Sequence, residues 1–221
     1  MTEIVEFNNI ELSIDNVKNK IIHGDCLEVM RALPEKCIDI IITSPPYNLL
    51  NSTGNGLKKN TNCGKWKNAS IKDGYKDYDD NMPYPEYVEW QKQCITEMYR
   101  LMKEDGAINF NAGYFLPITE QIYMICNKAF KLRKGTNKLT DVWEIKQEMK
   151  NPHPAPFPEA LIDRIIESTE GTLVLDPFSG SGTTAVCARK DNKDFILIEK
   201  SYSYCEMAKR RIDGEEDWRN G

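Results

Sequence analysis

Short apolar runs alternate with amphipathic segments along most of this chain. Runs rich in Ile, Val and Leu predict buried strands at 20–25, 37–44, 107–110, 172–175 and 195–198. Apolar residues at three- and four-residue spacing predict helices over 26–33, 85–103, 159–168, 185–189 and 202–212. Alternation of this kind indicates an α/β fold, with a doubly wound, mostly parallel sheet and helices on both faces.

Four segments are less regular. Residues 1–17 resemble an extension, 104–106 predict a turn, and the apolar segment 118–126 fits either a strand or a helix. Residues 50–84 are rich in Asn, Gly, Lys, Ser and Tyr and have no apolar period. A loop of that length is too long for an ordinary connection, and we expect it to be functional.

Composition limits the possible classes of protein. The 221 residues, 40% of them hydrophobic, fit one domain over 1–221, and no apolar run approaches the length that a bilayer requires. The first residues are acidic and polar, so we expect no signal peptide and a cytoplasmic protein. Seven cysteines without paired spacing and only two histidines favour reduced thiols and predict no metal site.

Charge weighs against one kind of nucleic-acid binding. A formal net charge of -5 argues against a protein that coats nucleic acid through bulk charge alone. A local basic surface is still compatible with the sequence, because lysines cluster around Trp66 in the long loop. A solvated loop is the alternative for such a cluster.

The string Thr43-Ser44-Pro45-Pro46-Tyr47-Asn48 ends the second apolar run. Neither proline can donate to a sheet ladder, so the strand opens into a rigid loop at its carboxyl end. The two fixed φ angles hold the serine hydroxyl and the tyrosine ring in one orientation before a ligand arrives, which suits chemistry on a flat ring that bears an amine. The alternative is an ordinary proline-rich strand exit.

A glycine-rich string, DPFSGSGTT over 176–184, follows the fourth strand and precedes a helix. Its glycines let a ligand approach backbone amides at the amino end of that helix. The string lacks the Gly-Lys-Ser/Thr of a P-loop, so it does not predict a triphosphate site. Glu199 ends the next strand and fits a carboxylate that accepts hydrogen bonds from ribose hydroxyls.

Together, LDPFSGSGTT and TSPPYN, with HGD before the second and NPHPAPFP before the first, resemble the site-specific DNA amino-methyltransferases that use S-adenosylmethionine. The order of the motifs, with the catalytic loop first, resembles the β group, a circular rearrangement of the same sheet. The resemblance covers about 21–212. It implies a Rossmann-like methyltransferase sheet, S-adenosylmethionine as cofactor and double-stranded DNA as partner, with restriction-modification as a possible context.

The resemblance also implies site residues. A catalytic tetrapeptide would be formed by Ser44, Pro45, Pro46 and Tyr47. Cofactor-binding residues would be Asp25, His153, Pro154, Asp176, Phe178, Ser179, Gly180, Ser181, Gly182, Thr183 and Glu199. We expect the Asp176 and Glu199 carboxylates to serve the ligand more than the core. In the long loop we expect DNA contacts from Lys58, Lys59, Lys65, Trp66 and Lys67.

A mechanism follows from these groups. An exocyclic amine is a poor nucleophile, and Ser44 Oγ and the Pro45 carbonyl could both accept its hydrogens and expose the nitrogen lone pair. Tyr47 would stack on a base that has been flipped out of the duplex. In the family, serine at the first position goes mostly with cytosine N4, whereas Tyr47-Asn48-Leu49 also resembles adenine N6 members. The sequence thus favours cytosine and leaves adenine open.

Other functions stay open at this point. Related loops methylate RNA or protein glutamine, and a catalytically impaired DNA-binding relative would keep the same strings. The target sequence, a restriction partner and the choice between monomer and homodimer are not legible in the sequence.

One stretch departs from the family pattern. Relatives carry a few dozen residues, including a strand, between strings that resemble 106–108 and 108–115, whereas here the two strings are fused. A deletion would strip a strand from the sheet edge, a costly change. The alternative, which we favour, is that the numbering runs across residues missing between about Gly106 and Asn111, so that two consecutively numbered Cα atoms stand much farther apart than ~3.8 Å.

Overall fold

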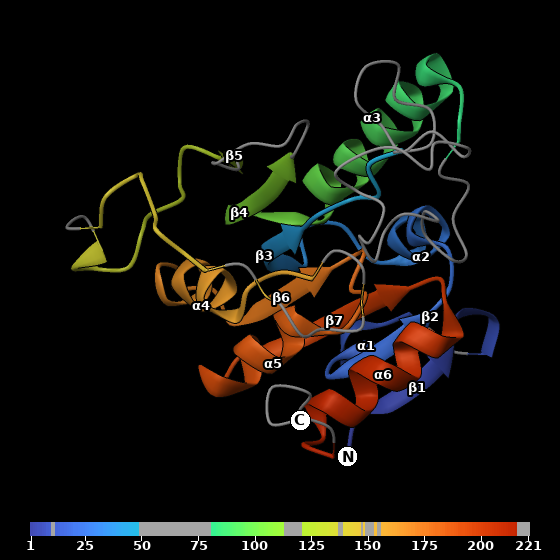
Figure 1. Cartoon of the computed structure of the whole chain (residues 1–221). Coiled ribbons are helices and arrows are strands. Elements are labelled where there is room, and N and C mark those ends of the chain that lie inside the picture. Colours follow the sequence, from blue (N-terminus) through green and yellow to red (C-terminus); the bar gives the residue numbers. More distant parts are fainter. Residues whose placement is uncertain are drawn as a thin grey trace, which may run out of the picture.

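The structure, a computed structural model, describes residues 1–9, 12–48, 81–112, 121–136, 139–146, 148, 153 and 156–215. Its centre is a seven-stranded sheet in the order β1-β2-β7-β6-β3-β4-β5 (Figure 1). The strands are β1 (Glu3–Glu6), β2 (Lys20–His23), β3 (Ile38–Thr43), β4 (Met102–Ala112), β5 (Gln121–Cys126), β6 (Leu173–Asp176) and β7 (Asp194–Glu199). Every neighbouring pair is parallel except β4 and β5.

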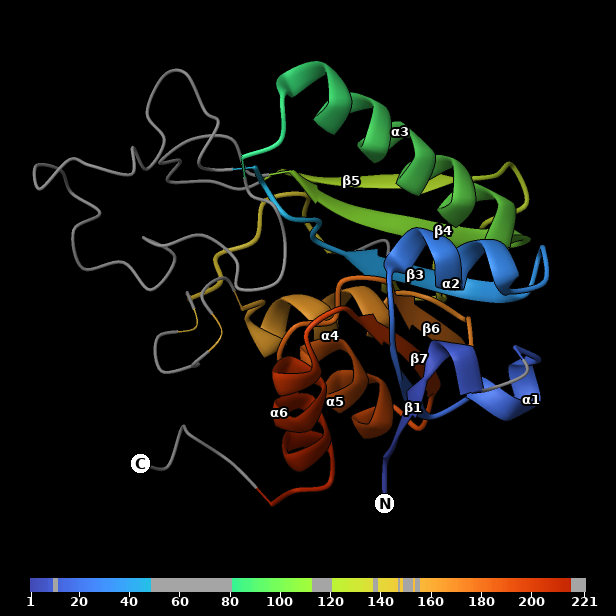
Figure 2. The same ribbon diagram turned by 90° about the vertical axis from the view of Figure 1, so that its right-hand side faces the viewer.

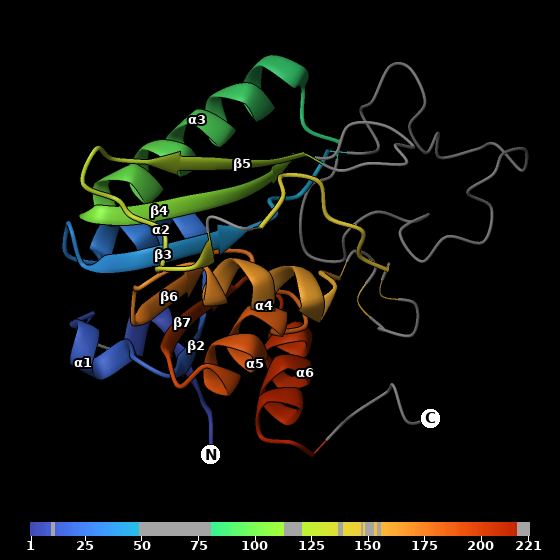
Figure 3. The same cartoon turned by 90° about the vertical axis from the view of Figure 1, so that its left-hand side faces the viewer.

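Helices cover both faces of the sheet (Figures 2 and 3). On one face lie α1 (Ile14–Val17), α2 (Cys26–Ala32) and α3 (Tyr84–Leu101), and on the other lie α4 (Glu159–Glu167), α5 (Thr183–Lys190) and α6 (Tyr202–Ile212). Each strand supplies apolar side chains to both layers: Ile41 packs toward α2 and α3, and Ile40 packs toward α4 and α5. The predicted doubly wound, mostly parallel α/β fold is confirmed.

The amino-terminal segment is part of the fold, so the prediction of an extension over 1–17 is wrong. β1 pairs in parallel with β2, with Ile4 opposite Ile21. A short 3-10 helix, η1 (Phe7–Asn9), follows it. Thr2 donates from its backbone N–H and its hydroxyl to Asp213 Oδ1 at the end of α6, both over 2.7 Å. These contacts join segments far apart in sequence, which local patterning does not reveal.

β4 corrects two further expectations. The predicted turn at 104–106 lies within the strand, where the register with β3 shifts between Met102 and Ala107. Gly106 lies at this irregularity, and a Cβ there would stand 2.8 Å from the Asp39 carbonyl oxygen. From Ala107 to Phe110 the strand pairs with both β3 and β5. The chain is therefore continuous between Gly106 and Asn111, and the favoured explanation of missing residues is wrong.

β5 decides the ambiguous segment 118–126 in favour of a strand, antiparallel to β4 and at the edge of the sheet. Tyr123, Met124 and Ile125 are 51%, 46% and 37% exposed. No charged residue or proline interrupts this strand. Such residues commonly protect an edge strand from pairing with other chains, and β5 itself carries none of these protecting residues.

Most of the predicted long loop, residues 49–80, lies outside the described residues. Its end is described: Pro83 precedes α3, and Pro85 lies in the first turn of that helix, as predicted. None of the helices described here is long and apolar enough to cross a membrane.

Candidate active site

The carboxyl ends of β2, β3, β6 and β7 open into a cavity of about 350 Å³. Among the residues predicted for the site, those that line it are Asp25, Ser44, Pro46, His153, Phe178, Ser179, Gly180, Ser181, Thr183 and Glu199. β3 and β6 are neighbours that are followed by helices on opposite faces of the sheet, and this switch in direction opens a crevice above their ends. Two strings that are more than 100 residues apart thus share one cavity.

The glycine-rich string forms a tight loop between β6 and α5. Gly180 and Gly182 have φ angles of +48° and +76°, a region that residues with a Cβ rarely adopt. A Cβ on Gly180 would lie 2.7 Å from His153 Nε2, and one on Gly182 would lie 2.8 Å from Ala208 Cβ. Both glycines are therefore required by close packing as well as by backbone conformation.

Glu199 joins this loop to the end of β7. One carboxylate oxygen accepts the Gly180 N–H at 2.8 Å, and the other accepts the Ser201 N–H at 2.8 Å. The side chain is half-buried and lines the cavity. Each oxygen has a second lone pair, so the carboxylate can also accept hydrogen bonds from a ligand.

The Asp176 side chain was expected to face the ligand, but it lies outside the cavity. Its side chain is 1% exposed and is absent from the cavity lining. It accepts hydrogen bonds from the Thr184 hydroxyl at 2.6 Å and from the Phe178 N–H at 3.1 Å, so it braces the loop from behind. The pKa of Asp176 is raised to about 7, mainly by burial and in smaller part by the nearby Glu199 carboxylate. The two hydrogen bonds lower this pKa and offset only part of the rise.

The cavity has the features of a cofactor cradle. Ser179 is buried and lines the cavity, and among the described residues its hydroxyl has no hydrogen-bond partner. Asp25 caps α2 through one oxygen, which accepts the Leu27 N–H at 3.0 Å. Its other oxygen lies 3.8 Å from Lys200 Nζ. Among the described residues, an unpaired hydroxyl and two carboxylates in one cavity fit a polar ligand with hydroxyl groups.

The proline loop is held by α3 and the residues before it. The Tyr87 hydroxyl donates to the Pro46 carbonyl oxygen at 2.9 Å. Asn48, in a left-handed conformation with φ of 53°, exchanges two hydrogen bonds with the Met82 backbone, at 2.7 and 2.8 Å. Ser44 Oγ and the Tyr47 hydroxyl are hydrogen-bonded to each other. These hydrogen bonds anchor the loop, which the two prolines predict to be rigid.

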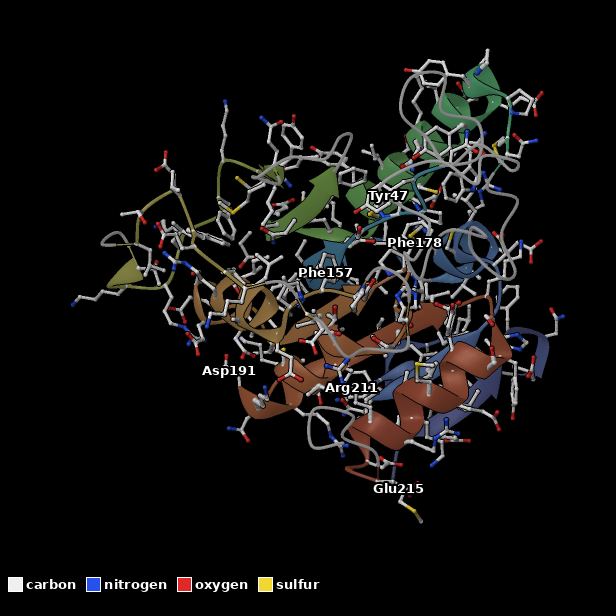
Figure 4. The ribbon with its side chains drawn as sticks, viewed as in Figure 1. Tyr47, Phe157, Phe178, Asp191, Arg211 and Glu215 are labelled. Carbon is white, nitrogen blue, oxygen red and sulfur yellow. The ribbon has the colours of Figure 1, made fainter. Side chains whose placement is uncertain are left out.

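Aromatic rings line the space between the two loops. Trp90 of α3 meets Phe178 edge to face, with ring centroids 5.7 Å apart, and both line the cavity. His153 meets Tyr204 of α6 at 4.7 Å between centroids. Figure 4 labels Tyr47, Phe157 and Phe178, which come from three different segments of the chain.

Several lining residues were not predicted from the sequence. They are Gly24, Cys26, Met82, Trp90, Pro177, Ile198, Lys200, Ser201 and Tyr204. Most flank a predicted motif directly, so a wider window around each motif would have found them. Trp90 and Tyr204 lie on helices whose pattern shows only a packed face, and no local signal distinguishes them.

Some predicted residues are not in the cavity lining. Pro45, Tyr47 and Gly182 belong to the two loops but are not among the lining residues. Pro154 and the proposed DNA contacts Lys58, Lys59, Lys65, Trp66 and Lys67 lie outside the described residues.

Known proteins resemble this chain in sequence and in fold. The family model described as DNA methylase, for N6 and N4 methyltransferases, matches residues 38–137 and 119–210. Type II methyltransferase M.BglII of Bacillus subtilis is 26% identical over 280 aligned residues, which cover 91% of this chain and 71% of that protein. Type II methyltransferase M.HpaI of Haemophilus parainfluenzae is 28% identical, over 89% of this chain and 74% of its own length.

Two solved structures have the same fold. A DNA modification methylase of Thermus thermophilus, TTHA0409, was solved in complex with S-adenosyl-L-methionine, and it matches with a TM-score of 0.61 at 18% identity. That match covers 88% of this chain and 93% of the other. The cytosine-N4-specific PvuII DNA methyltransferase matches with a TM-score of 0.63 at 18% identity, over 90% and 88% of the two chains.

The alignments include segments that this chain lacks. The alignment with M.BglII runs over 280 positions, more than the 221 residues of this chain, so that relative carries segments that are missing here. Residues 119–137, which include β5, take part in both family matches. With matches that together span 38–210, this chain belongs to the N6/N4 DNA methylase family.

Proposed function

We propose that this protein transfers the methyl group of S-adenosylmethionine to the exocyclic amine of a base flipped out of double-stranded DNA, and that the base is cytosine, methylated at N4. One observation carries the proposal. Ser44 and Pro46 of the proline loop line the same cavity as Ser179, Gly180 and Glu199 of the glycine loop. A methyl donor bound by the glycine loop and a base bound by the proline loop would therefore meet in one cavity.

The residues have separate tasks. Glu199 would accept hydrogen bonds from the ribose hydroxyls, and Asp25 would lie near the adenine. The Ser179 hydroxyl, which has no partner among the described residues, would gain one from the cofactor. His153 packs over Gly180 and closes the wall of the cavity. When bound, S-adenosylmethionine supplies a methyl group on a positively charged sulfur, which leaves with the electrons of the carbon–sulfur bond.

The proline loop prepares the amine. Ser44 Oγ and the Pro45 carbonyl oxygen accept its two hydrogens, which draws the nitrogen lone pair out of conjugation with the ring and toward the methyl group. Tyr47 offers its ring face to the flipped base. Ser44 and Tyr47 are hydrogen-bonded to each other, so a base that binds Ser44 competes with the Tyr47 hydroxyl.

The choice of base rests on Ser44, which favours cytosine by resemblance. Adenine N6 is the second candidate, because relatives of both kinds are similar to this chain. PvuII DNA methyltransferase is named as cytosine-N4-specific, and YhdJ of Escherichia coli, 24% identical over 90% of this chain, is named a DNA adenine methyltransferase. The third candidate is a catalytically impaired DNA-binding relative, which the fused stretch at 106–115 favours.

One assay separates these candidates. The purified protein is incubated with labelled S-adenosylmethionine and unmethylated genomic DNA, which offers every short target sequence, and the digested nucleosides are analysed. We expect N4-methylcytosine. Detection of N6-methyladenine would show that adenine is the target base. Binding of cofactor and DNA without methylation would support a catalytically impaired relative. RNA and protein substrates serve as controls for the other acceptors.

DNA contact by the long loop is part of this proposal. The lysines of residues 50–84 suit phosphate binding, and Met82, near the end of this segment, lines the cavity. The contacts of Lys58, Lys59, Lys65, Trp66 and Lys67, and a cytoplasmic location, stay predictions.

A further inference from the structure

Arg211 is a buried charge in the last turn of α6, directly behind the glycine loop (Figure 4). Its side chain is 6% exposed. It does not line the cavity, and no motif of the sequence singled it out. A buried guanidinium is costly unless its hydrogens are bound, so its partners show what it holds in place.

One fork of the guanidinium binds the glycine loop. Nη1 donates to the Thr183 hydroxyl at 2.7 Å and lies 3.3 Å from the Ser181 carbonyl oxygen and 3.4 Å from the Ser181 hydroxyl. Ser181 and Thr183 both line the cavity. One turn earlier on α6, Ala208 packs against Gly182 so closely that no Cβ would fit there. Helix α6 therefore supports three consecutive residues of the loop from behind.

The other fork binds the start of α4. Nη2 donates to Glu159 Oε1 at 2.8 Å. Glu159 is the first residue of α4 and directly follows the segment in which Pro156 and Phe157 line the cavity. Two walls of the cavity, the glycine loop and the 156–157 segment, are thus tied to one guanidinium.

Glu159 has a second cationic partner, which gives a matched control. Lys190 of α5 donates to Glu159 Oε2, and its side chain is 48% exposed. Burial alone would raise the pKa of Glu159, but the hydrogen bonds from Lys190 and Arg211 hold it below its ordinary value. Arg211 also donates to the glycine loop, whereas Lys190 binds Glu159 and lies 3.7 Å from Asp163.

We propose that Arg211 is a positioning residue for cofactor binding, which sets the glycine loop at the distance from the 156–157 segment that S-adenosylmethionine requires. The proposal rests on the placement of the cofactor in this cavity. A planar fork can bind Glu159 and the loop at once, whereas the single ammonium of a lysine cannot span both. The role is exerted through Ser181 and Thr183, since Arg211 does not reach the cavity.

The test compares Arg211→Lys with Lys190→Met. Calorimetry measures the Kd for S-adenosylmethionine, and thermal unfolding without ligand measures stability. We expect Arg211→Lys to weaken cofactor binding about tenfold, as the loss of one or two charge-assisted hydrogen bonds would. Lys190→Met should leave the Kd unchanged. In methyl transfer, Arg211→Lys should raise the KM for the cofactor and change kcat less than twofold.

A double variant separates positioning from mere stability. Glu159→Leu with Arg211→Met replaces the ion pair by apolar side chains, a change that often preserves or raises stability. We expect this variant to keep the unfolding temperature and to bind the cofactor at least as weakly as Arg211→Lys. If Arg211→Lys binds as the unaltered protein does, the positioning role is overturned. If the unaltered protein itself fails to bind, the cofactor site is wrong, which is a separate result.

Discussion

Tyr87 on α3 holds the Pro46 carbonyl oxygen at 2.9 Å, and its hydroxyl in turn accepts a hydrogen bond from Gln91 at 2.9 Å. The contact crosses 41 positions of sequence, including all of residues 49–80. It fixes the orientation of the peptide group between Pro46 and Tyr47. This group directly follows the Pro45 carbonyl, which we propose as an acceptor for a hydrogen of the target amine. Helix α3 is therefore a support of the catalytic loop as well as a covering helix of the sheet.

Tyr87→Phe should slow methyl transfer without changing the fold. The loss of one neutral hydrogen bond corresponds to a change of up to about tenfold in kcat, with an unchanged Kd for the cofactor. Tyr84→Phe, an exposed tyrosine on the same helix, is the matched control and should behave as the unaltered protein does. Equal kcat in both variants would show that the loop needs no support from α3.

Ser44→Ala should lower kcat by about 10²-fold, because it removes one preorganised acceptor of the amine. The Kd for S-adenosylmethionine should change little, which calorimetry checks. A rate equal to that of the unaltered protein would reduce the proline loop to an ordinary strand exit.

Tyr47 offers a paired test of stacking. Tyr47→Phe keeps the ring face and removes the hydroxyl that binds Ser44, so we expect it to retain most of the activity. Tyr47→Ala should weaken productive DNA binding by roughly 1–3 kcal/mol. Fluorescence of a pyrrolocytosine base, an analogue of cytosine, at the target position reports flipping directly. Similar losses in both variants would contradict stacking as the main role.

Asp176 predicts a pH dependence of stability. Its pKa in the folded protein is about 7, above the ordinary 3.8, so the folded state binds more protons than the unfolded chain between these values. Its contribution to the free energy of unfolding is therefore complete below about pH 4 and is lost as the pH rises to about 7. The loss is on the order of a few kcal/mol.

Asp176→Asn removes this titration and can keep both hydrogen bonds, with the amide donating to Thr184. We expect the unfolding temperature of the variant to exceed that of the unaltered protein increasingly as the pH rises from about 4 to about 7. The difference between the two curves isolates Asp176 from other groups, such as Asp213, whose pKa is lowered to about 2. A constant difference across this range would exclude Asp176 as the titrating group.

Glu199→Gln should weaken binding of S-adenosylmethionine by about 10-fold or more, since the side chain loses its charge and one of its accepting oxygens becomes a donor. That amide would also face the N–H of Gly180 or Ser201. Glu206→Gln, at an exposed glutamate of α6 that does not line the cavity, is the control for the loss of a carboxylate. An unchanged Kd for Glu199→Gln would contradict the proposed contact between Glu199 and the ribose.

The exposed edge at β5 should promote self-association. Met124→Lys places a charge on this strand and should raise the protein concentration at which light scattering shows large species, as charges on edge strands do. Met124→Leu keeps the apolar surface and serves as control. Cofactor affinity should be equal in all three proteins. Identical scattering curves would show that β5 does not mediate association.

The sequence by itself determined the alternation of strands and helices, because buried strands and amphipathic helices each have a periodicity that can be counted in one dimension. It also determined the two loops: prolines at 45 and 46 and glycines at 180 and 182 restrict or free the backbone wherever they stand. The strand ends of a parallel sheet meet at one edge, so Ser44 and Glu199 were expected at a common site, and both line the cavity.

Only the tertiary structure decided what each side chain faces. Asp176 and Glu199 both end strands, yet the Asp176 carboxyl turns to Thr184 behind the loop while Glu199 stays in the cavity. Tyr87, Trp90 and Arg211 act across the fold on partners at least 28 residues away, and their own segments show only helical periodicity. A local pattern records burial, whereas the partner of a buried polar group depends on which elements the sheet brings together.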